Sequence, residues 1–357
     1  MFGLQNGGLD ELARLRLMKL FARRPLLICL LLNLAMLSAQ AQTTLTVYSA
    51  LEADQIKAYQ AKFEEENPDV KLKWVRDSTG IITAKLLAEK ANPQADIVFG
   101  LAASSLLTLE KEGMLQNYAA KGYEKLSKQY VSDSTPPSWI GMDVWGATIC
   151  FNTVEAAKTG LKKPESWKDL LKPEYKGKIV MPNPASSGTG YFDVTAWLLI
   201  MGEKEGWAYM DKLHDNIAQY THSGSKPCKQ ASAGEFPIGI SFEYRAAKLK
   251  EGGAPLDLIF PKEGLGWDLE AIALLKGSKN LNAAKKLADW GASKTANELY
   301  EKNFAIVAMP GVAKPHPLIP NDYEKRLVKQ DLRWSAANRD RILAEWSKRY
   351  DNKSEKK

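Results

Sequence analysis

The chain has 357 residues, of which 45% are hydrophobic and 25% charged, with 49 Lys and Arg against 42 Asp and Glu. This is the composition of a globular protein long enough for two lobes of ordinary domain size. The net charge of +7 falls to about +4 without the first 41 residues, and only the KSEKK tail concentrates one sign, so charge does not indicate nucleic-acid binding.

The N-terminal segment predicts export. Two arginines precede a nearly unbroken apolar run over 25–38, and the small-x-small sequence AQA follows at 39–41. This pattern predicts a cleaved signal peptide over residues 1–41, with an uncleaved anchor as the alternative. The run is shorter than the roughly 20 residues of a membrane span. The stretch before Met18 is unlike a signal sequence, so we expect Met18 to be the true start and Gln42 to begin the mature protein.

Two cysteines remain in the mature chain, Cys150 and Cys228. An exported protein meets an oxidising environment, so a disulfide and two separate buried thiols are both compatible with the sequence. The three histidines, His214, His222 and His316, are scattered, so no metal site is expected from them.

The hydrophobic pattern predicts alternating strands and helices in chain order. Strands at 45–48, 70–75 and 95–99 are each followed by a helical pattern, over 52–66, 81–91 and 102–112. Later strands are predicted at 147–152, 178–181, 238–242, 256–260 and 270–275, and helices at 203–213, 243–250, 280–292 and 339–350. The order predicts an α/β lobe with a largely parallel sheet, formed by 42–145 and 272–357, and a second lobe formed by 146–271.

Three polar turns that contain glycine each open a predicted helix. They are DSTG at 77–80, PASSGTG at 184–190 and HSGS at 222–225. Helix N-termini carry unpaired N–H groups and the positive end of the dipole, so several of them meeting at one cleft would hold an anion. The alternative is ordinary N-capping, which uses the same residue types.

These turns belong to segments that carry a family resemblance. The chain resembles the substrate-binding proteins of the ferric-ion-binding structural group, and within that group the putative 2-aminoethylphosphonate-binding proteins of phosphonate ABC importers. The resemblance covers most of the mature chain, and its segments are LTVYSALEADQIKAY (45–59), WVRDSTGIITAKLLAEKANPQADIVFG (74–100), GKIVMPNPASSGTGY (177–191), YTHSGSKPCKQASAGEFPIGISFEYRAAKLK (220–250) and FPKEGLGWDLEAIALLKG (260–277).

The resemblance implies a two-lobed type II periplasmic binding protein fold of the α/β class, with a ligand cleft between the lobes. It implies a monomeric periplasmic protein that captures 2-aminoethylphosphonate and delivers it to the permease subunits of an ABC importer. Neither enzymatic activity, nor a cofactor, nor a nucleic-acid partner is expected.

The resemblance also suggests which residues hold each end of the ligand. The phosphonate would be held by hydroxyls and backbone N–H groups of Ser78, Thr79, Ser187, Gly188, Thr189, Ser223 and Ser225. The ammonium needs a carboxylate or an aromatic face. Asp268 and Glu243 are the expected carboxylates, and Trp267 or Tyr48 the expected packing residue.

Other ligands and one other class of protein remain open. The ligand could instead be phosphate, sulfate, a carboxylated amine or ferric ion. Ferric-ion binders use adjacent tyrosines, whereas this chain reads Phe242-Glu243-Tyr244-Arg245 with one tyrosine, which argues against iron. A hydrolase is the remote alternative, because the SSGTG turn does not match G-x-S-x-G and no suggestive His partner is present.

Overall fold

The computed structural model describes residues 42–356. Residues from Thr44 onward form one compact unit. The predicted signal peptide over 1–41 and the start at Met18 lie outside the described residues. Within the described part, none of the helices is both long and apolar enough to cross a membrane.

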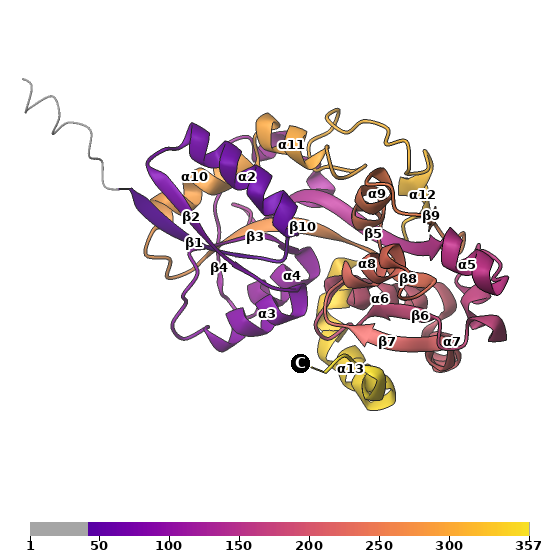
Figure 1. Cartoon of the computed structure of the whole chain (residues 1–357). Helices are drawn as coiled ribbons and strands as arrows, with labels where there is room; N and C mark the ends of the chain where they lie inside the picture. Colours follow the sequence, from indigo (N-terminus) through magenta and orange to yellow (C-terminus); the bar gives the residue numbers. More distant parts are fainter. Residues whose placement is uncertain (1–41, 357) are drawn as a thin grey trace, which may run out of the picture. The chain divides into compact units, whose positions relative to one another are not determined.

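The first part of the chain alternates strands with helices, as predicted (Figure 1). Its elements are β1 (Thr43–Ser49), α2 (Ala53–Glu66), β2 (Val70–Arg76), α3 (Thr79–Ala88), β3 (Ile97–Ala102), α4 (Ala103–Lys111), β4 (Leu115–Gln116) and the short 3-10 helices η1 (Tyr123–Lys125) and η2 (Lys128–Tyr130). All six residues of β3 are buried, as expected of a central strand covered on both faces.

A second set of elements follows from residue 140. It comprises β5 (Ile140–Asn152), α5 (Thr153–Thr159), η3 (Lys168–Leu171), η4 (Pro173–Tyr175), β6 (Ile179–Pro182), α6 (Gly188–Met201), α7 (Glu203–Asn216), β7 (Ile217–Thr221), α8 (Lys226–Ala233), β8 (Ile238–Phe242), α9 (Glu243–Glu251) and β9 (Leu256–Ile259). The sequence pattern missed β7, a short strand directly after α7.

The C-terminal part begins with a long strand and continues in helices. Its elements are β10 (Trp267–Leu275), α10 (Leu281–Gly291), α11 (Lys294–Tyr300), α12 (Tyr323–Arg326), α13 (Leu332–Tyr350) and η5 (Asp351–Lys353). Helix α13 starts seven residues before the predicted 339, where the Asp331 carboxylate caps it by accepting a hydrogen bond from Arg333 N.

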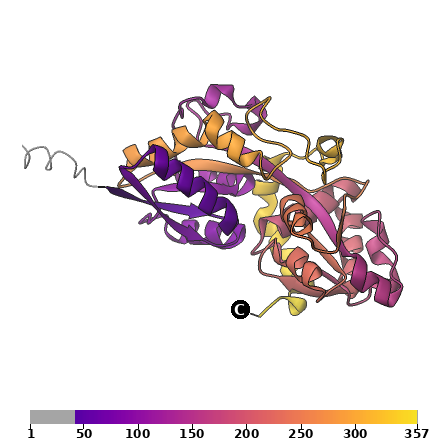
Figure 2. The ribbon, with the colours of Figure 1, turned by 45° about the horizontal axis from the view of Figure 1, so that its top comes forward.

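The strands hydrogen-bond in the order β2-β1-β3-β10-β5-β8-β6-β7, with β4 added beside β10 and β9 beside β5. Strands β1 and β3 run parallel, as do β6 with β7 and with β8. Strand β10 is antiparallel to both β3 and β5. Two α/β lobes are therefore joined through the antiparallel pair of β5 and β10, which Figure 2 shows running between them.

Strand β5 belongs to both halves of this arrangement. Residues 140–146 pair with β10, whereas residues 147–152 pair with β8 and β9. All thirteen residues are buried, including Asp143. The predicted strand at 147–152 covered only the second half, because an aspartate and two glycines make the first half unlike a strand pattern.

Two large hydrophobic cores sit on either side of these crossing strands. The first core includes Val47, Phe99 and Ile272, and the second includes Ile149, Ile240 and Trp346. The division into 42–145 with 272–357, and 146–271, stays a prediction, but one part of it conflicts with the packing. Residues of α13 at four-residue spacing, from 342 to 350, are buried in the second core, whereas Leu332 and Ala336 at its start pack against the first core, so this helix contacts both lobes.

A disulfide joins Cys150 of β5 to Cys228 of α8, with the two Cα atoms 5.4 Å apart. This separation lies in the ordinary range for a bridge, and it resolves the two readings that the sequence left open. The disulfide fixes α8 on the second-lobe sheet, and the turn at 222–225 leads directly into that helix.

Reduction of this disulfide should destabilise the protein. A cross-link between residues 78 positions apart restricts the unfolded chain, and loss of such a bridge typically lowers the free energy of unfolding by about 2–5 kcal/mol. Thermal melts with and without reductant measure the effect. The control is the double variant C150A/C228A, whose melting temperature should not respond to reductant; an equal response would contradict the assignment.

Candidate ligand-binding site

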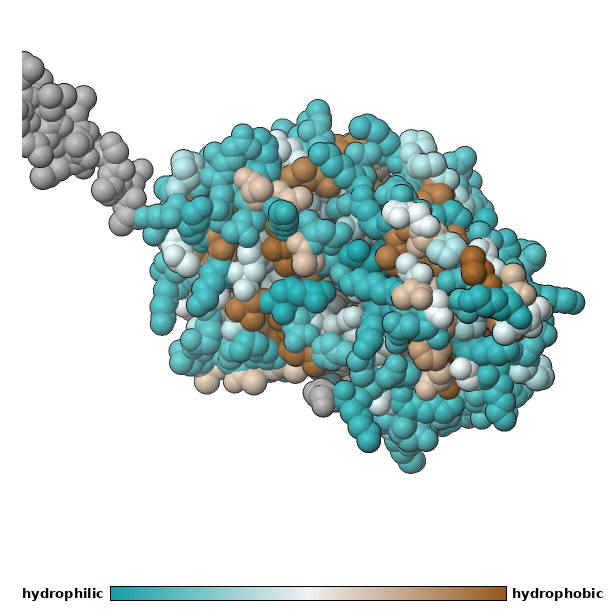
Figure 3. Space-filling model, in the orientation of Figure 1, coloured by the Kyte–Doolittle hydropathy of each residue, from teal (hydrophilic) through white to brown (hydrophobic). Residues whose placement is uncertain are grey.

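A cleft opens where the ends of strands from both lobes meet. Its empty space is about 470 Å³, counting space open to solvent. Its walls are formed by Ala50, Glu52, Arg76, Ser78, Thr79, Gly100, Ala102, Trp145, Ser187, Gly188, Thr189, Ser223, Gly224, Phe242 and Glu270. Hydrophilic residues cover much of the molecular face in Figure 3.

Six of the seven predicted phosphonate contacts line this cleft. They are Ser78, Thr79, Ser187, Gly188, Thr189 and Ser223. They come from the starts of α3 and α6 and from the turn before α8, so all three turns reach one space. Ser225 is the exception, because it is buried at the N-cap of α8 and does not line the cleft. Their role as ligand contacts stays a prediction.

Ordinary capping does not account for the hydroxyls at these helix starts. Ser78 occupies the N-cap of α3, yet its side chain makes no capping hydrogen bond. Ser187 caps α6 only through a long bond, 3.4 Å from Gly190 N to Ser187 Oγ. Within the described residues, the side-chain hydroxyls of Ser78, Thr79 and Thr189 have no hydrogen-bond partner, so these groups remain available to a ligand.

Two glycines let these turns approach one another. A Cβ atom at Gly188 would lie 2.7 Å from Thr79 Oγ1, across the cleft. A Cβ atom at Gly224 would collide with the Thr189 side chain. Any larger residue would therefore separate the hydroxyls that the three turns bring together.

The two sides of the cleft touch at its edge. Gly80 N, in the first turn of α3, donates a hydrogen bond of 2.8 Å to Ser186 O of the second lobe. His222 Nε2 lies 2.8 Å from Asp77 Oδ1, again between the two lobes. The structure therefore shows the lobes in contact around the cleft.

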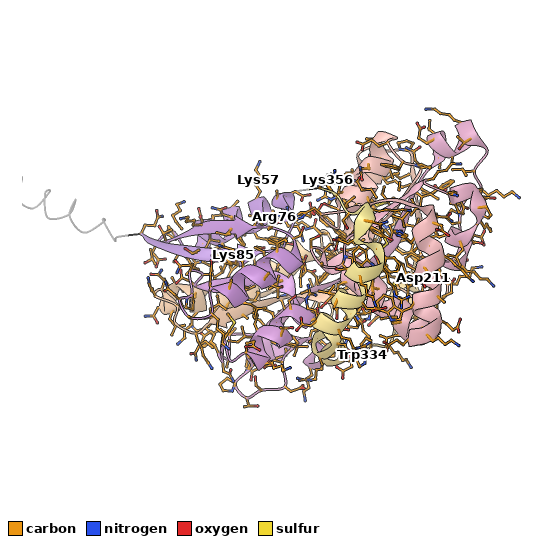
Figure 4. The ribbon with its side chains drawn as sticks, turned by 90° about the horizontal axis from the view of Figure 1, so that it is seen from below. Lys57, Arg76, Lys85, Asp211, Trp334 and Lys356 are labelled. Carbon is orange, nitrogen blue, oxygen red and sulfur yellow. A yellow bond between two sulfur atoms is a disulfide. The ribbon has the colours of Figure 1, made fainter. Side chains whose placement is uncertain are left out.

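Glu52 is a cleft carboxylate that the chain already neutralises. Its oxygens lie 2.9 Å from the Arg245 guanidinium, 3.4 Å from that of Arg76 and 3.4 Å from Lys229 Nζ. Arg245 also bonds Asp54 at 3.0 Å. Arg76 ends β2 on the first-lobe side (Figure 4), and its Nε donates to the backbone. Glu52 thus organises cations and leaves little negative charge for a ligand.

The two predicted amine-binding carboxylates are not in the cleft. Asp268 is 3% exposed, and its carboxylate accepts hydrogen bonds from Ser104 Oγ at 2.5 Å and from Leu269 N at 2.7 Å. Glu243 is 1% exposed and accepts from Gly146 N at 2.8 Å. Burial raises the pKa of Asp268 to about 6 and that of Glu243 to about 8. Both side chains serve internal contacts, so this prediction is wrong.

The two predicted packing residues are also turned away from the cleft. Trp267 Nε1 donates to Val328 O at 2.8 Å, on a different surface of the molecule. The Tyr48 hydroxyl donates to the Glu89 carboxylate at 2.9 Å and is buried beneath α3. Each lies near a strand end, but the side chains of successive strand residues point to opposite faces, and these point away.

Sequence reasoning missed five side chains that line the cleft: Glu52, Arg76, Trp145, Phe242 and Glu270. Arg76 and Phe242 are the last residues of β2 and β8, and Glu52 follows the end of β1. The rule that ligand residues follow strand carboxyl ends could have found these three. Trp145 and Glu270 lie inside the crossing strands, and no local signal marks them.

Tyr244 is not available as a metal ligand. Its hydroxyl donates to Asp54 Oδ2 at 2.7 Å, and burial, followed by this hydrogen bond, raises the pKa of the phenol. Among residues 42–356 no group of three or more His, Cys, Asp and Glu side chains is arranged to hold a metal ion.

The family is decided by a sequence model of bacterial extracellular solute-binding proteins, which matches residues 92–334. The chain belongs to this family. Its members deliver small molecules to ABC transporter permeases, so the chain is an extracytoplasmic solute-binding protein and not an enzyme. The hydrolase alternative is therefore wrong.

Curated relatives agree with this family. An uncharacterized protein of Haemophilus influenzae is 34% identical over 73% of this chain and 76% of its own length. A probable ABC transporter periplasmic-binding protein of Sinorhizobium fredii is 26% identical, with 82% of each chain covered. A putative 2-aminoethylphosphonate-binding periplasmic protein of Salmonella typhimurium is 24% identical, covering 80% of this chain and 81% of that one.

Solved structures confirm the two-lobed type II binding-protein fold. The periplasmic binding protein AfuA of Actinobacillus pleuropneumoniae, with fructose-6-phosphate bound, superposes with a TM-score of 0.81 at 29% identity, covering 87% of this chain and 99% of that one. Iron-bound HitA of Pseudomonas aeruginosa has a TM-score of 0.71 at 19% identity, over 85% and 99% of the two chains. The second likeness concerns the fold alone.

Substitution of Glu52 should destabilise the unliganded protein. Its side chain and that of Arg245 are each 11% exposed, and breaking a buried ion pair typically lowers the free energy of unfolding by about 3 kcal/mol. Denaturant unfolding of Glu52→Gln measures the loss. Asp54→Asn is the matched control, because the Asp54 side chain is 50% exposed. This substitution should lower the free energy of unfolding by less than about 1 kcal/mol. Equal effects of the two substitutions would contradict this ranking.

Proposed function

We propose that the protein is a monomeric periplasmic component of an ABC importer that captures a small solute with a terminal phosphonate or phosphate group, with 2-aminoethylphosphonate as the preferred ligand. The observation that carries the proposal is the meeting of three turns at helix starts in one cleft, with hydroxyls of Ser78, Thr79 and Thr189 unbonded.

The residue types suit an anionic group with three acceptor oxygens. Hydroxyls and backbone N–H groups at helix starts donate hydrogen bonds without bringing a full charge into the cleft. A phosphonate carries between one and two negative charges near neutral pH, by analogy with phosphate monoesters. Contact between the lobes around it would exclude water and strengthen each of these hydrogen bonds.

The rest of the cleft accommodates a short organic tail. Trp145 and Phe242 supply apolar surface in the same walls as the hydroxyls. The likeness to the Salmonella typhimurium protein supports an aminoethyl tail. The same site would hold inorganic phosphate or sulfate less tightly, since these anions leave the apolar walls uncovered.

A sugar phosphate is the second candidate ligand. AfuA, which shares 29% of aligned residues with this chain, has fructose-6-phosphate bound in its solved structure. The phosphate of such a ligand would use the same hydroxyls, and the carboxyl groups of the cleft would accept hydrogen bonds from the sugar.

Isothermal titration calorimetry of the purified protein tests the ligand. We expect binding of 2-aminoethylphosphonate that is tighter than binding of ethylphosphonate, phosphate or fructose-6-phosphate. Tighter binding of fructose-6-phosphate would replace the preferred ligand while keeping the phosphoryl site. Absence of heat with every phosphorus compound would refute the proposed function.

The substitution Thr189→Val should weaken binding of the phosphonate, while it keeps the shape of the side chain. Loss of one hydrogen bond to a charged group lowers affinity by about 10- to 100-fold. Thr195→Val in the same helix is the control, since its hydroxyl bonds Tyr191 O and Phe192 O at 3.1 Å and does not line the cleft. Unchanged affinity of the Thr189 variant would remove this residue from the site.

A further inference from the structure

Two carboxyl groups face each other across the strands that join the lobes. Glu270 of β10 lies directly opposite Asp143 of β5 in the antiparallel register. Residues in this position place their side chains on the same face of the sheet, where two like charges repel. Glu270 lines the ligand cleft, whereas Asp143 is 0% exposed behind it.

This pair lacks the hydrogen-bond and ion-pair partners that Glu52 and Asp268 have. Neither oxygen of Asp143 has a hydrogen-bond donor among the described residues. Glu270 receives one long bond, 3.4 Å from Gln55 Nε2. No Lys or Arg of the described chain forms an ion pair with either carboxyl, in contrast to Glu52, which three cations surround.

The surroundings of the pair add acids and phenols. Tyr59 of α2 and Tyr300 of α11 lie within electrostatic reach of both carboxyls, Glu243 within reach of Asp143, and Glu52 within reach of Glu270. The Tyr300 hydroxyl donates to Gly291 O at 3.2 Å, so it does not supply the missing donor. Burial first, and then the neighbouring acid groups, raise the pKa of Asp143, and burial also raises the pKa of Glu270.

We infer that Glu270, backed by Asp143, receives the end of the ligand remote from the phosphonate and selects a cationic amine there. The inference rests on the proposed function and names the chemistry of the tail. A buried carboxyl opposite a partly buried one, with no cation paired to either, can retain a proton between them, as acid pairs of other proteins do. A ligand ammonium supplies the counter-charge and three N–H donors that the chain itself does not provide.

The same geometry gives Asp143 a positioning role. A shared proton held on Asp143 donates to Glu270 and leaves the cleft-facing carboxylate charged. An asparagine at 143 can donate an N–H in the same place, so Asp143→Asn mimics the protonated acid. Glu270→Gln removes the charge that meets the ammonium while conserving size.

The test is calorimetry of the wild-type protein and both variants with 2-aminoethylphosphonate and ethylphosphonate, which differ by the amine. We expect the wild type to bind 2-aminoethylphosphonate about 30-fold or more tightly than ethylphosphonate. Glu270→Gln should reduce this ratio of affinities to within about threefold of unity, whereas Asp143→Asn should retain it. Ethylphosphonate affinity should change little in either variant, which also reports that the phosphonate contacts are intact.

Proton linkage provides a second readout that a purely structural role would not alter. Because the pKa values of both carboxyls are raised, the charged form of Glu270 gains population as pH rises. The amine preference of the wild type should therefore increase between pH 6 and 9, by up to about tenfold per pH unit. This rise should be shallower in Asp143→Asn and absent in Glu270→Gln. The wild-type titration alone suffices if a variant does not fold.

The outcomes separate the inference from the proposed function. Binding of both phosphonates with an amine preference that Glu270→Gln leaves unchanged would overturn the inference and keep the phosphonate site. Binding of ethylphosphonate or fructose-6-phosphate with no gain from an amine, at any pH, would do the same. Absence of binding by every phosphorus ligand would remove both.

Discussion

The cleft depends on the antiparallel pairing of β5 with β10, because β10 pairs with β3 of the first lobe and β5 continues from this pairing into the sheet of the second lobe. Their register sets which side chains lie between the lobes, and a shift of one residue would turn Glu270 and Trp145 to the opposite face. The buried acid at 143 sits in this pairing. The strand that passes between the two hydrophobic cores thus also carries a buried polar group, although burial of such a group lowers stability.

Charge is distributed unevenly in the cleft. The three turns contribute hydroxyls and N–H groups without formal charge, while Glu52 is neutralised by its own cations. Glu270 lines the same space and forms no ion pair with a Lys or Arg of residues 42–356. The arrangement resembles the charge pattern of a short ligand with an anion at one end and a cation at the other, which gives specificity through both ends.

The fold by itself does not decide the ligand. A protein solved with iron bound and one solved with fructose-6-phosphate bound share this architecture, and a protein named for 2-aminoethylphosphonate is similar in sequence. Ligand contacts in such proteins come from turns and strand ends that a rigid scaffold presents, so one fold can serve different ligands. In this chain the tyrosine expected of an iron site instead donates a hydrogen bond to Asp54.

The sequence by itself determined the family, the alternating order of strands and helices, and the three turns whose hydroxyls line the cleft, because each of these is a local pattern. It named Asp268 and Glu243 as ligand carboxylates, and the tertiary structure instead buried both in internal hydrogen bonds. Only the fold brought Glu270 into the cleft beside Asp143, more than a hundred residues away along the chain. The physical reason is that strand register and the crossing between lobes are set by packing over long separations, which no local spacing records.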